Sequence, residues 1–442
     1  MVRKRHSFTQ GDPGRTLFAM ALPMVWGLLA TMSFNAVDTY FVAQLGSDAL
    51  AAMSFTFPVV MVITSMAIGL GAGTSSIIAR LLGQEREQDA RQTSADTLLM
   101  AAVLALVTAA VGLATIEPLF GLLGAEPHLL PLVREYMGIW YFNTPFVILP
   151  MILSALMRAS GNNHIAGNLM LVAALFNALL DPLLIFGLGP FPRLEIAGAA
   201  WATLTTRGIL FLAELYFALR LGVIGMPHRY WRGLSQSWRA VMHVGLPAMA
   251  TNTIIPLASG VTVALVASHG VDAVAGYGVA VRIEPVVLIA FYALSGVMGP
   301  FLGQNMQERL RHRQREALRA VTRFCLVFGA LVAVLLWFAG EFLARMFSDA
   351  SAVIEVAVSY LMIVPLSYGA YGLVMTVNAG FNGLGRPWPA MSLSALRVLV
   401  LYLPLALLAQ WLLGLPGLFA ATALANLITG LLAWRWLQRQ LY

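Results

Sequence analysis

Long apolar stretches recur along this chain and constrain its fold more than any other feature. A helix needs about 20 apolar residues to cross the hydrocarbon core of a bilayer. Hydrophobic residues make up 59% of the sequence and charged residues only 11%, too few to cover a water-soluble chain of 442 residues. The sequence therefore predicts an all-α polytopic membrane protein with twelve transmembrane helices. The predicted spans cover residues 17–45, 50–82, 93–116, 131–158, 165–188, 196–220, 240–268, 273–305, 318–340, 353–382, 388–412 and 416–438.

The distribution of positive charge orients the predicted spans. Most of the 27 basic residues lie in the N-terminal tail and in loops on one side, with the largest group running from Arg309 to Arg323. Only Arg134, Arg193 and Arg345 lie on the other side. Because positive loops stay in the cytoplasm, we predict a multi-pass protein of the bacterial inner membrane with both termini cytoplasmic. Basic residues arranged in this way argue against nucleic-acid binding.

The two halves of the chain resemble each other. Residues 46–51 (GSDALA) match residues 270–275 (GVDAVA), an offset of 224 residues, and at the same offset Leu22-Pro23 falls on Leu246-Pro247. Six spans followed by six similar spans keep the same orientation, and in such transporters the substrate path lies between the halves. The predicted division is an N-lobe at 1–220, a cytoplasmic linker at 221–239 and a C-lobe at 240–442.

Two carboxylates lie inside the apolar stretches of the first half. Asp38 is in the first span, and Asn177 and Asp181 share one face of the fifth span because they are four residues apart. Pro182 cannot bond the carbonyl group of Ala178, which leaves that oxygen free nearby. Carboxylate, amide and carbonyl oxygens are typical of a Na⁺ site, and carboxylates inside a membrane also serve as proton carriers. The sequence leaves both ions open.

The repeat sharpens this interpretation. At the offset of 224 residues, Asp38 aligns with Thr262, and Asn177 and Asp181 align with Leu401 and Leu405. The scaffold is therefore duplicated while the carboxylates are not, which favours a functional role over a purely structural one. The alternative is that both acids are packing residues with satisfied hydrogen bonds at helix contacts.

The second half carries its own polar pair in the eighth span, Arg282 and Glu284. Glu284 is a candidate for a second proton or substrate site, and the competing interpretation is an ion pair that fixes helix packing. Arg207 and Arg397 are interpreted as structural charges with partners. Glu214 is expected near a helix end, with its carboxylate reaching the interface.

Some side chains near the first-half acids suit a flat, amphipathic cation. Phe34 lies one turn before Asp38, and Met170 and Ala174 continue the face of Asp181. Aromatic and methionine side chains bind such molecules through cation–π contacts and adaptable packing. The chain has no phosphate-binding loop for ATP and no histidine or cysteine cluster, so we predict a transporter that is not an enzyme and needs no cofactor.

Several stretches in order along the chain resemble the multidrug and toxic compound extrusion (MATE) family. The stretches are VDTYFV at 37–42, GAGT at 71–74, RASGN at 158–162, the Asn177 and Asp181-Pro182 positions, GAAWAT at 198–203, RIE at 282–284 and PFLGQN at 300–305. The resemblance implies two six-helix bundles that form a V around a central cleft. It also implies an N-lobe cation site, which adds Thr203 to Asp38, Asn177 and Asp181.

The resemblance implies antiport by alternating access, in which entry of H⁺ or Na⁺ at the N-lobe site drives release of a cationic or amphipathic drug. Residues 361–381 of the tenth span contain no acid. This is similar to the DinF-like branch and unlike members that use a C-lobe acid there. We expect a monomer surrounded by membrane lipid. The alternative is a lipid or lipid-linked oligosaccharide flippase of the same superfamily, which would need more cavity cations.

Overall fold

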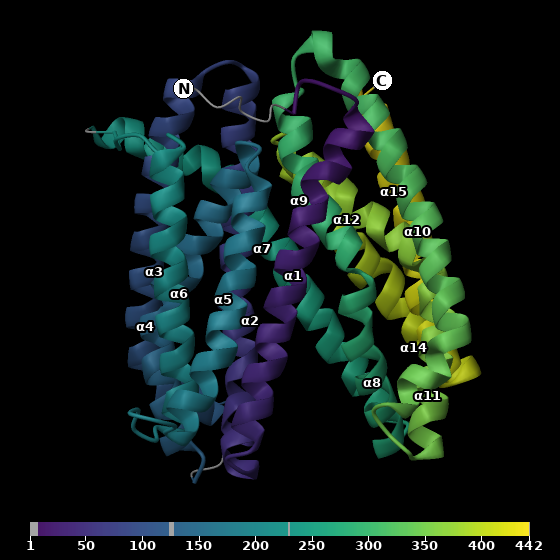
Figure 1. The fold of residues 1–442 in the computed structure, drawn as a ribbon. Coiled ribbons are helices and arrows are strands. Elements are labelled where there is room, and N and C mark those ends of the chain that lie inside the picture. Colours follow the sequence, from purple (N-terminus) through teal and green to yellow (C-terminus); the bar gives the residue numbers. More distant parts are fainter. Residues whose placement is uncertain (1–7, 123–127, 229, 442) are drawn as a thin grey trace. The chain divides into compact units, whose positions relative to one another are not determined.

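The computed structural model describes residues 8–122, 128–228 and 230–441, and all regular structure within these ranges is helical (Figure 1). Eleven helices of the described residues are long and apolar enough to cross a membrane. A twelfth span results if α8 and α9, bent by 47°, are counted together. The prediction of an all-helical membrane protein is thus confirmed. The helices are α1 (Pro13–Ala43), α2 (Ser47–Gly83), α3 (Glu87–Leu122), α4 (Leu130–Ala159), α5 (Asn163–Phe186), α6 (Glu195–Arg220), α7 (Trp231–Ala267), α8 (Val271–Val287), α9 (Ile289–Gln304), η1 (Glu308–Leu310), α10 (Arg311–Arg345), α11 (Ser351–Ile363), η2 (Val364–Ser367), α12 (Tyr368–Gly383), α13 (Pro387–Ala395), the π-helix η3 (Leu396–Tyr402), α14 (Leu403–Leu413) and α15 (Leu415–Leu441).

Prolines coincide with breaks in two of the predicted spans. Pro285 lies within α8, three residues before Leu288, at which α8 gives way to α9. Pro365 lies in the 3₁₀ segment η2 between α11 and α12. Because proline removes a backbone hydrogen bond and crowds the preceding turn, the eighth and tenth spans bend where the sequence places these residues.

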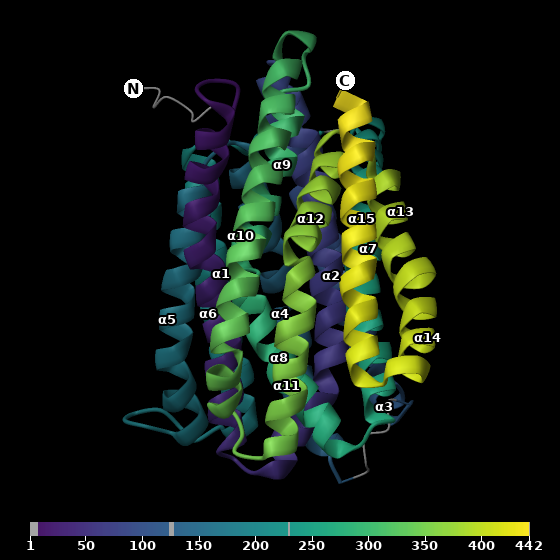
Figure 2. The ribbon, with the colours of Figure 1, turned by 90° about the vertical axis from the view of Figure 1, so that its right-hand side faces the viewer.

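Packing divides the described residues into two units. One holds 23–249 and the other holds 8–22 together with 250–441. The boundaries therefore fall inside α1, between Leu22 and Pro23, and inside α7, between Met249 and Ala250. In the first unit, α4 packs against α2, α3 and α6. In the second, α12 packs against α9, α10 and α15, and α14 lies beside α15 (Figure 2).

The backbone repeats some unusual conformations at the predicted offset. Gly46 precedes α2 with φ 116° and Gly270 precedes α8 with φ 104°. Gly161 and Gly385, which also align at 224 residues, have φ values of 81° and 72°. Side chains other than glycine rarely adopt such positive φ angles. The internal repeat thus extends from the sequence to the geometry of its turns.

The first described residues belong to the second unit because the start of α10 holds them. The Arg313 guanidinium donates from Nη2 to the carbonyl oxygens of Phe8 and Gln10, each at 3.0 Å. At the other end of the chain, Arg315 Nε donates to the Leu441 carbonyl oxygen at 2.8 Å. Both ends of the described chain therefore contact the start of the same helix. The predicted basic residues Arg3, Lys4, Arg5 and Arg229 lie outside the described residues.

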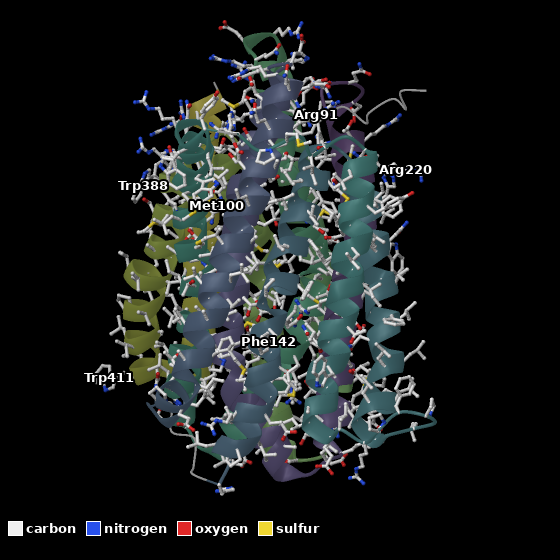
Figure 3. All side chains as sticks on the ribbon, turned by 90° about the vertical axis from the view of Figure 1, so that its left-hand side faces the viewer. Arg91, Met100, Phe142, Arg220, Trp388 and Trp411 are labelled. Atoms are coloured by element: carbon white, nitrogen blue, oxygen red, sulfur yellow. The ribbon has the colours of Figure 1, made fainter. Side chains whose placement is uncertain are left out.

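Large apolar side chains point outward from the helices, as expected for surfaces in contact with lipid. Figure 3 shows Phe142, Trp388 and Trp411 on the outside, and these side chains are 63%, 61% and 81% exposed. Arg91 and Arg220 lie close to the start of α3 and at the end of α6, respectively. This separation of apolar walls from charged ends is what a bilayer selects.

Candidate functional site

Two glycines bring α1 and α5 close together in the first unit. A Cβ atom on Gly167 would lie 2.4 Å from the carbonyl oxygen of Pro23, and one on Gly27 would lie 3.0 Å from the Gly167 Cα atom. Asp38 and Asp181 follow these glycines by about three to four helical turns along α1 and α5. The contact therefore anchors the two helices that carry the first-half carboxylates.

The structure buries the acids of these helices without protein partners. Asp38 is 5% exposed, and Asn177 and Asp181 are 0% exposed. Asp38 Oδ1, both carboxylate oxygens of Asp181 and both amide atoms of Asn177 are buried without a hydrogen-bond partner among the described residues. Because an unsatisfied buried carboxylate costs several kcal/mol or more, this site gains stability from a bound proton or cation.

Helices α4 and α6 add a tyrosine and an arginine to this region. Arg207 of α6 is close enough to Asp38 and to Tyr136 of α4 for electrostatic interaction, and Asp38 interacts with Asp181 in the same way. Thr203, placed in the site by family resemblance, lies one turn before Arg207 and is 4% exposed. The sequence interpretation of Arg207 named no partner. The position of Arg207 inside an apolar span was the signal that it needs a partner.

The side chains predicted to line the substrate path occupy different places. The guanidinium carbon of Arg207 lies 5.8 Å from the ring centre of Phe34, which places Phe34 beside the charged cluster. Met170 Sδ lies 3.4 Å from the Cβ position of Gly27, so Met170 packs where α1 and α5 approach each other. Ala174 is buried on α5. A role for these residues in binding substrate stays a prediction.

The second unit treats its polar residues differently. Glu284 of α8 accepts a hydrogen bond from Tyr360 Oη at 2.8 Å, whereas Arg282 is exposed. The hydroxyl groups of Thr262 and Tyr402 lie 2.6 Å apart, within hydrogen-bond distance. Thr262 is the residue that aligns with Asp38, so the protein itself satisfies this position in the second unit.

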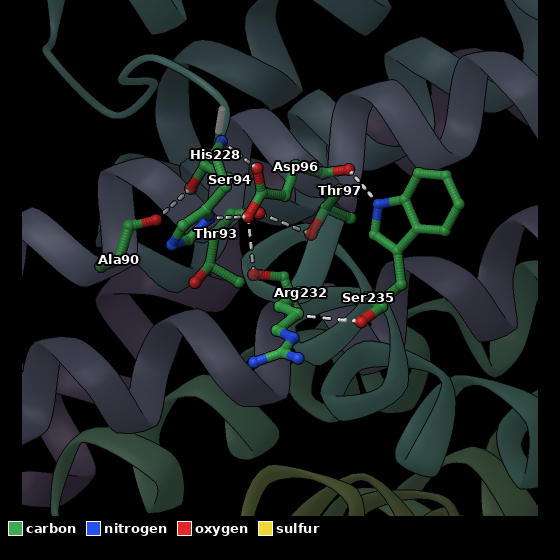
Figure 4. Close-up of polar contacts among 10 residues, drawn as sticks. Ala90, Thr93, Ser94, Asp96, Thr97, His228, Arg232 and Ser235 are labelled. Atoms are coloured by element: carbon green, nitrogen blue, oxygen red, sulfur yellow. Dashed lines mark hydrogen bonds and ion pairs between the residues drawn. The ribbon is translucent and has the colours of Figure 1, made fainter. Parts of the chain in front are cut away.

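Asp96 of α3 is a buried carboxylate that sequence reasoning missed, because it lies in the polar stretch 91–97 (RQTSADT) that precedes the apolar run. Its side chain accepts hydrogen bonds from the His228 backbone N–H at 2.8 Å, from His228 Nδ1 and from Ser237 Oγ at 2.6 Å (Figure 4). Trp238 Nε1 donates to the Asp96 carbonyl oxygen at 2.8 Å. These contacts tie the segment before α7 to α3. Because its hydrogen bonds are supplied, Asp96 has a structural role.

The expected exposure of Glu214 was wrong. Its side chain is 0% exposed, and Ser154 Oγ donates to Glu214 Oε1 at 2.7 Å. Arg158 of α4 interacts with it electrostatically. The carboxylate thus turns towards the α4 surface instead of reaching along α6 to the interface, because α4 offers both a donor and a positive charge.

Comparison with known proteins identifies the family and the fold of this chain. The family model MatE matches residues 23–183 and 247–408, two segments that start at the aligned positions Pro23 and Pro247. The FAD transporter of Shewanella oneidensis is 38% identical over 445 residues, covering 99% of this chain and 97% of that protein. The multidrug export protein MepA of Staphylococcus haemolyticus is 24% identical and covers 96% of this chain and 93% of its own.

Solved structures agree with the family match. The MATE transporter VcmN of Vibrio cholerae, crystallised in the bent form, superimposes with a TM-score of 0.92 at 32% identity. The match covers 97% of each chain. The relatives and the fold extend over nearly the whole sequence, and the family model matches a segment in each half of its repeat. The chain belongs to the MATE family of ion-coupled secondary transporters.

Proposed function

We propose that this chain exports flavin adenine dinucleotide (FAD) in exchange for H⁺ or Na⁺ bound at Asp38 and Asp181. The observation that carries the coupling proposal is a pair of buried carboxylates, of which Asp38 Oδ1 and both Asp181 oxygens have no hydrogen-bond donor among the described residues. Loading a cation there removes the cost of a bare charge in the membrane. A site whose stability depends on its ion is able to bias the first unit between two conformations.

Asn177 and Thr203 complete the proposed ion site. With the two carboxylates they supply only oxygen ligands of the kind that Na⁺ and other hard cations take. A proton needs only the carboxylates. The nearby Arg207 offsets one negative charge, so the unloaded site keeps a net charge of about −1, which attracts one monovalent cation.

Sequence similarity carries the substrate part of the proposal. The FAD transporter matches 99% of this chain at 38% identity, well above the 24% of the multidrug exporter. FAD is a flat aromatic compound with a pyrophosphate group. The second candidate substrate is a cationic, amphipathic drug, favoured by the two carboxylates and the Phe34 ring in the first unit.

The proposal also covers the branch of the MATE family, the orientation of the chain in the membrane and its oligomeric state. The carboxylates of the first unit, together with the lack of an acid at 361–381, favour the DinF-like branch. The concentration of arginine at the start of α10, beside both chain ends, favours cytoplasmic termini in the inner membrane. We propose a monomer as the working unit.

Transport into inside-out vesicles tests the proposed function. FAD and ethidium uptake would be measured with a pH gradient and a Na⁺ gradient imposed separately, for the wild type, Asp38→Asn and Asp349→Asn. Asp349 is exposed between α10 and α11 and serves as the control. We expect FAD uptake to follow one gradient, to be retained in Asp349→Asn and to be lost in Asp38→Asn.

Each contrary outcome has a distinct meaning. If the wild type takes up ethidium but not FAD, the second candidate, a cationic drug, replaces FAD as the proposed substrate. Gradient-driven uptake by Asp38→Asn at the wild-type rate would remove Asp38 from the coupling site. Failure of the wild type to move either compound would contradict both substrates, and lipid flipping would become the function to assay.

A further inference from the structure

Arg397 is an arginine in the middle of a membrane span of the second unit. It lies in the π-helix η3, ten residues after the start of the span Pro387–Leu413. π-Helical turns are rare in proteins, and those that occur often lie at functional sites. A charged side chain at this depth is costly, so it needs either a partner within the protein or a function that uses the charge.

The donors of Arg397 are mostly unused. Nη1 donates to Asn426 Oδ1 at 3.1 Å, the only hydrogen bond of this side chain among the described residues. Nε is buried and has no partner in the protein. A guanidinium has five N–H donors in a planar fork. The edge formed by Nε and Nη2 therefore has no acceptor among the described residues, and its two parallel donors match two oxygens of one phosphate group once the atoms that cover Nε move aside.

The surroundings of Arg397 hold the guanidinium in one orientation. Its carbon lies 4.7 Å from the ring centre of Tyr371 on α12. Asn426 is fixed in turn, because its Nδ2 donates to Ser367 Oγ at 3.0 Å. An arginine stacked on an aromatic ring and fixed at Nη1 loses little further entropy when its free edge binds an anion.

Glu284 is the acid that acts electrostatically on Arg397, and it is the structural alternative as a partner. No carboxylate oxygen of the described residues lies within 4.0 Å of the Arg397 nitrogens. The Glu284 carboxylate is held instead by Tyr360 Oη at 2.8 Å. Glu284 thus lowers the cost of the buried positive charge without occupying its free edge.

We infer that Arg397 binds a phosphate oxygen of the substrate through Nε and Nη2 and gives the transporter its preference for phosphorylated flavins. This inference rests on the proposed function, because a cationic drug has no group for this edge. Charge-assisted hydrogen bonds to a fixed guanidinium are among the strongest that a protein offers a phosphate.

Riboflavin, FMN and FAD test this inference because they share one ring system and carry no, one and two phosphate groups. Binding of each to the purified transporter would be measured by quenching of flavin fluorescence. We expect wild-type protein to bind FAD and FMN about tenfold or more tighter than riboflavin. In Arg397→Gln this ratio should fall to about one, whereas riboflavin binding is retained. Inorganic pyrophosphate should displace FAD from wild-type protein.

Two variants make the result specific. Arg435→Gln removes an exposed arginine of α15 in the same unit and should keep the wild-type ratio. Arg397→Lys keeps the charge without the planar fork and should give an intermediate ratio. It also serves as the test variant if Arg397→Gln does not fold.

The outcomes separate this inference from the proposed function. If the wild type exports FAD but both Arg397 variants keep its preference for FAD over riboflavin, the inference is wrong and the proposed function stands. If the wild type neither binds nor exports FAD, the proposed substrate is wrong and no phosphate-binding role is left for Arg397.

Discussion

The two units of this transporter are built on one repeated scaffold but treat their buried polar groups in opposite ways. In the first unit, Asp38 and Asp181 leave carboxylate oxygens without a donor. In the second, Thr262 stands at the position of Asp38 and reaches the hydroxyl group of Tyr402. The first unit therefore holds buried acids with unsatisfied oxygens, whereas the second satisfies the aligned position with its own side chains.

The basic residues show the same divergence. Arg207 lies on α6, where it acts on Asp38 and Tyr136. In the second unit the intramembrane arginine is Arg397 on η3, with Asn426 of α15 as its partner. Duplication supplied two similar frames, and the placement of a few charges assigned them different tasks. We propose ion coupling in the first unit and phosphate recognition in the second.

The largest expected effect comes from replacing the acids of each unit by their amides and comparing the two units. Asp38→Asn and Asp181→Asn should each lower gradient-driven export by about 100-fold. The amide carries no negative charge, so binding of the coupling ion no longer changes the charge of the site. Glu284→Gln should keep the dependence on the gradient, since Tyr360 already satisfies Glu284. Initial rates in inside-out vesicles measure both. Loss of gradient dependence in Glu284→Gln, with normal coupling in Asp38→Asn, would reverse the assignment of the units.

Asp96 allows a carboxylate with hydrogen-bond donors to be compared with the unsatisfied carboxylates of the first unit. Asp96→Ala leaves the His228 and Ser237 donors without an acceptor and should cost about 3 kcal/mol of stability. Thermal unfolding in detergent measures this loss. Transport per folded molecule should keep its gradient dependence, in contrast to Asp38→Asn. Uncoupled transport in a stable Asp96→Ala protein would show that partner satisfaction does not distinguish structural acids from functional ones.

Gly167 tests whether the approach of α1 to α5 is needed for the ion site. In Gly167→Ala the added methyl group meets the Pro23 carbonyl oxygen at 2.4 Å, so the helices must separate. We expect a loss of about 1–3 kcal/mol in stability and a lower apparent affinity for the coupling ion. Gly208→Ala on α6 is the matched control, because nothing lies within 4 Å of its Cβ position. Equal behaviour of both variants would contradict the role of this contact.

The smallest expected effect is in the second unit. Thr262→Val removes the hydroxyl partner of Tyr402 and should destabilise the protein by about 1 kcal/mol. The dependence of export on the ion gradient should not change, because Thr262 holds no coupling ion. A shift in thermal midpoint without a change in ion dependence is the expected result. A changed ion dependence would show that the second unit also takes part in coupling.

Sequence by itself determined the membrane class, the spans, the repeat and the identity of the candidate acids. Hydrophobic runs, proline positions and charges inside apolar segments are linear properties, and the bilayer acts on them directly. The bend after Pro285 and the matching turns at Gly46 and Gly270 lie where such signals place them. Even so, the sequence reading missed the buried Asp96 and expected the Glu214 carboxylate at the interface.

Only the tertiary structure decided which buried charges have partners. Tyr360 donates to Glu284 from 76 positions away, and Ser154 donates to Glu214 Oε1 across 60, while Glu214 Oε2 is left without a hydrogen-bond partner among the described residues. His228 and Ser237 satisfy Asp96 from more than 130 positions along the chain. Among the described residues, no donor from another helix forms a hydrogen bond with the Asp181 carboxylate. A hydrogen bond depends on distance and direction in space, and helix packing sets both, so the difference between a structural acid and a candidate ion site emerges only when the helices are assembled.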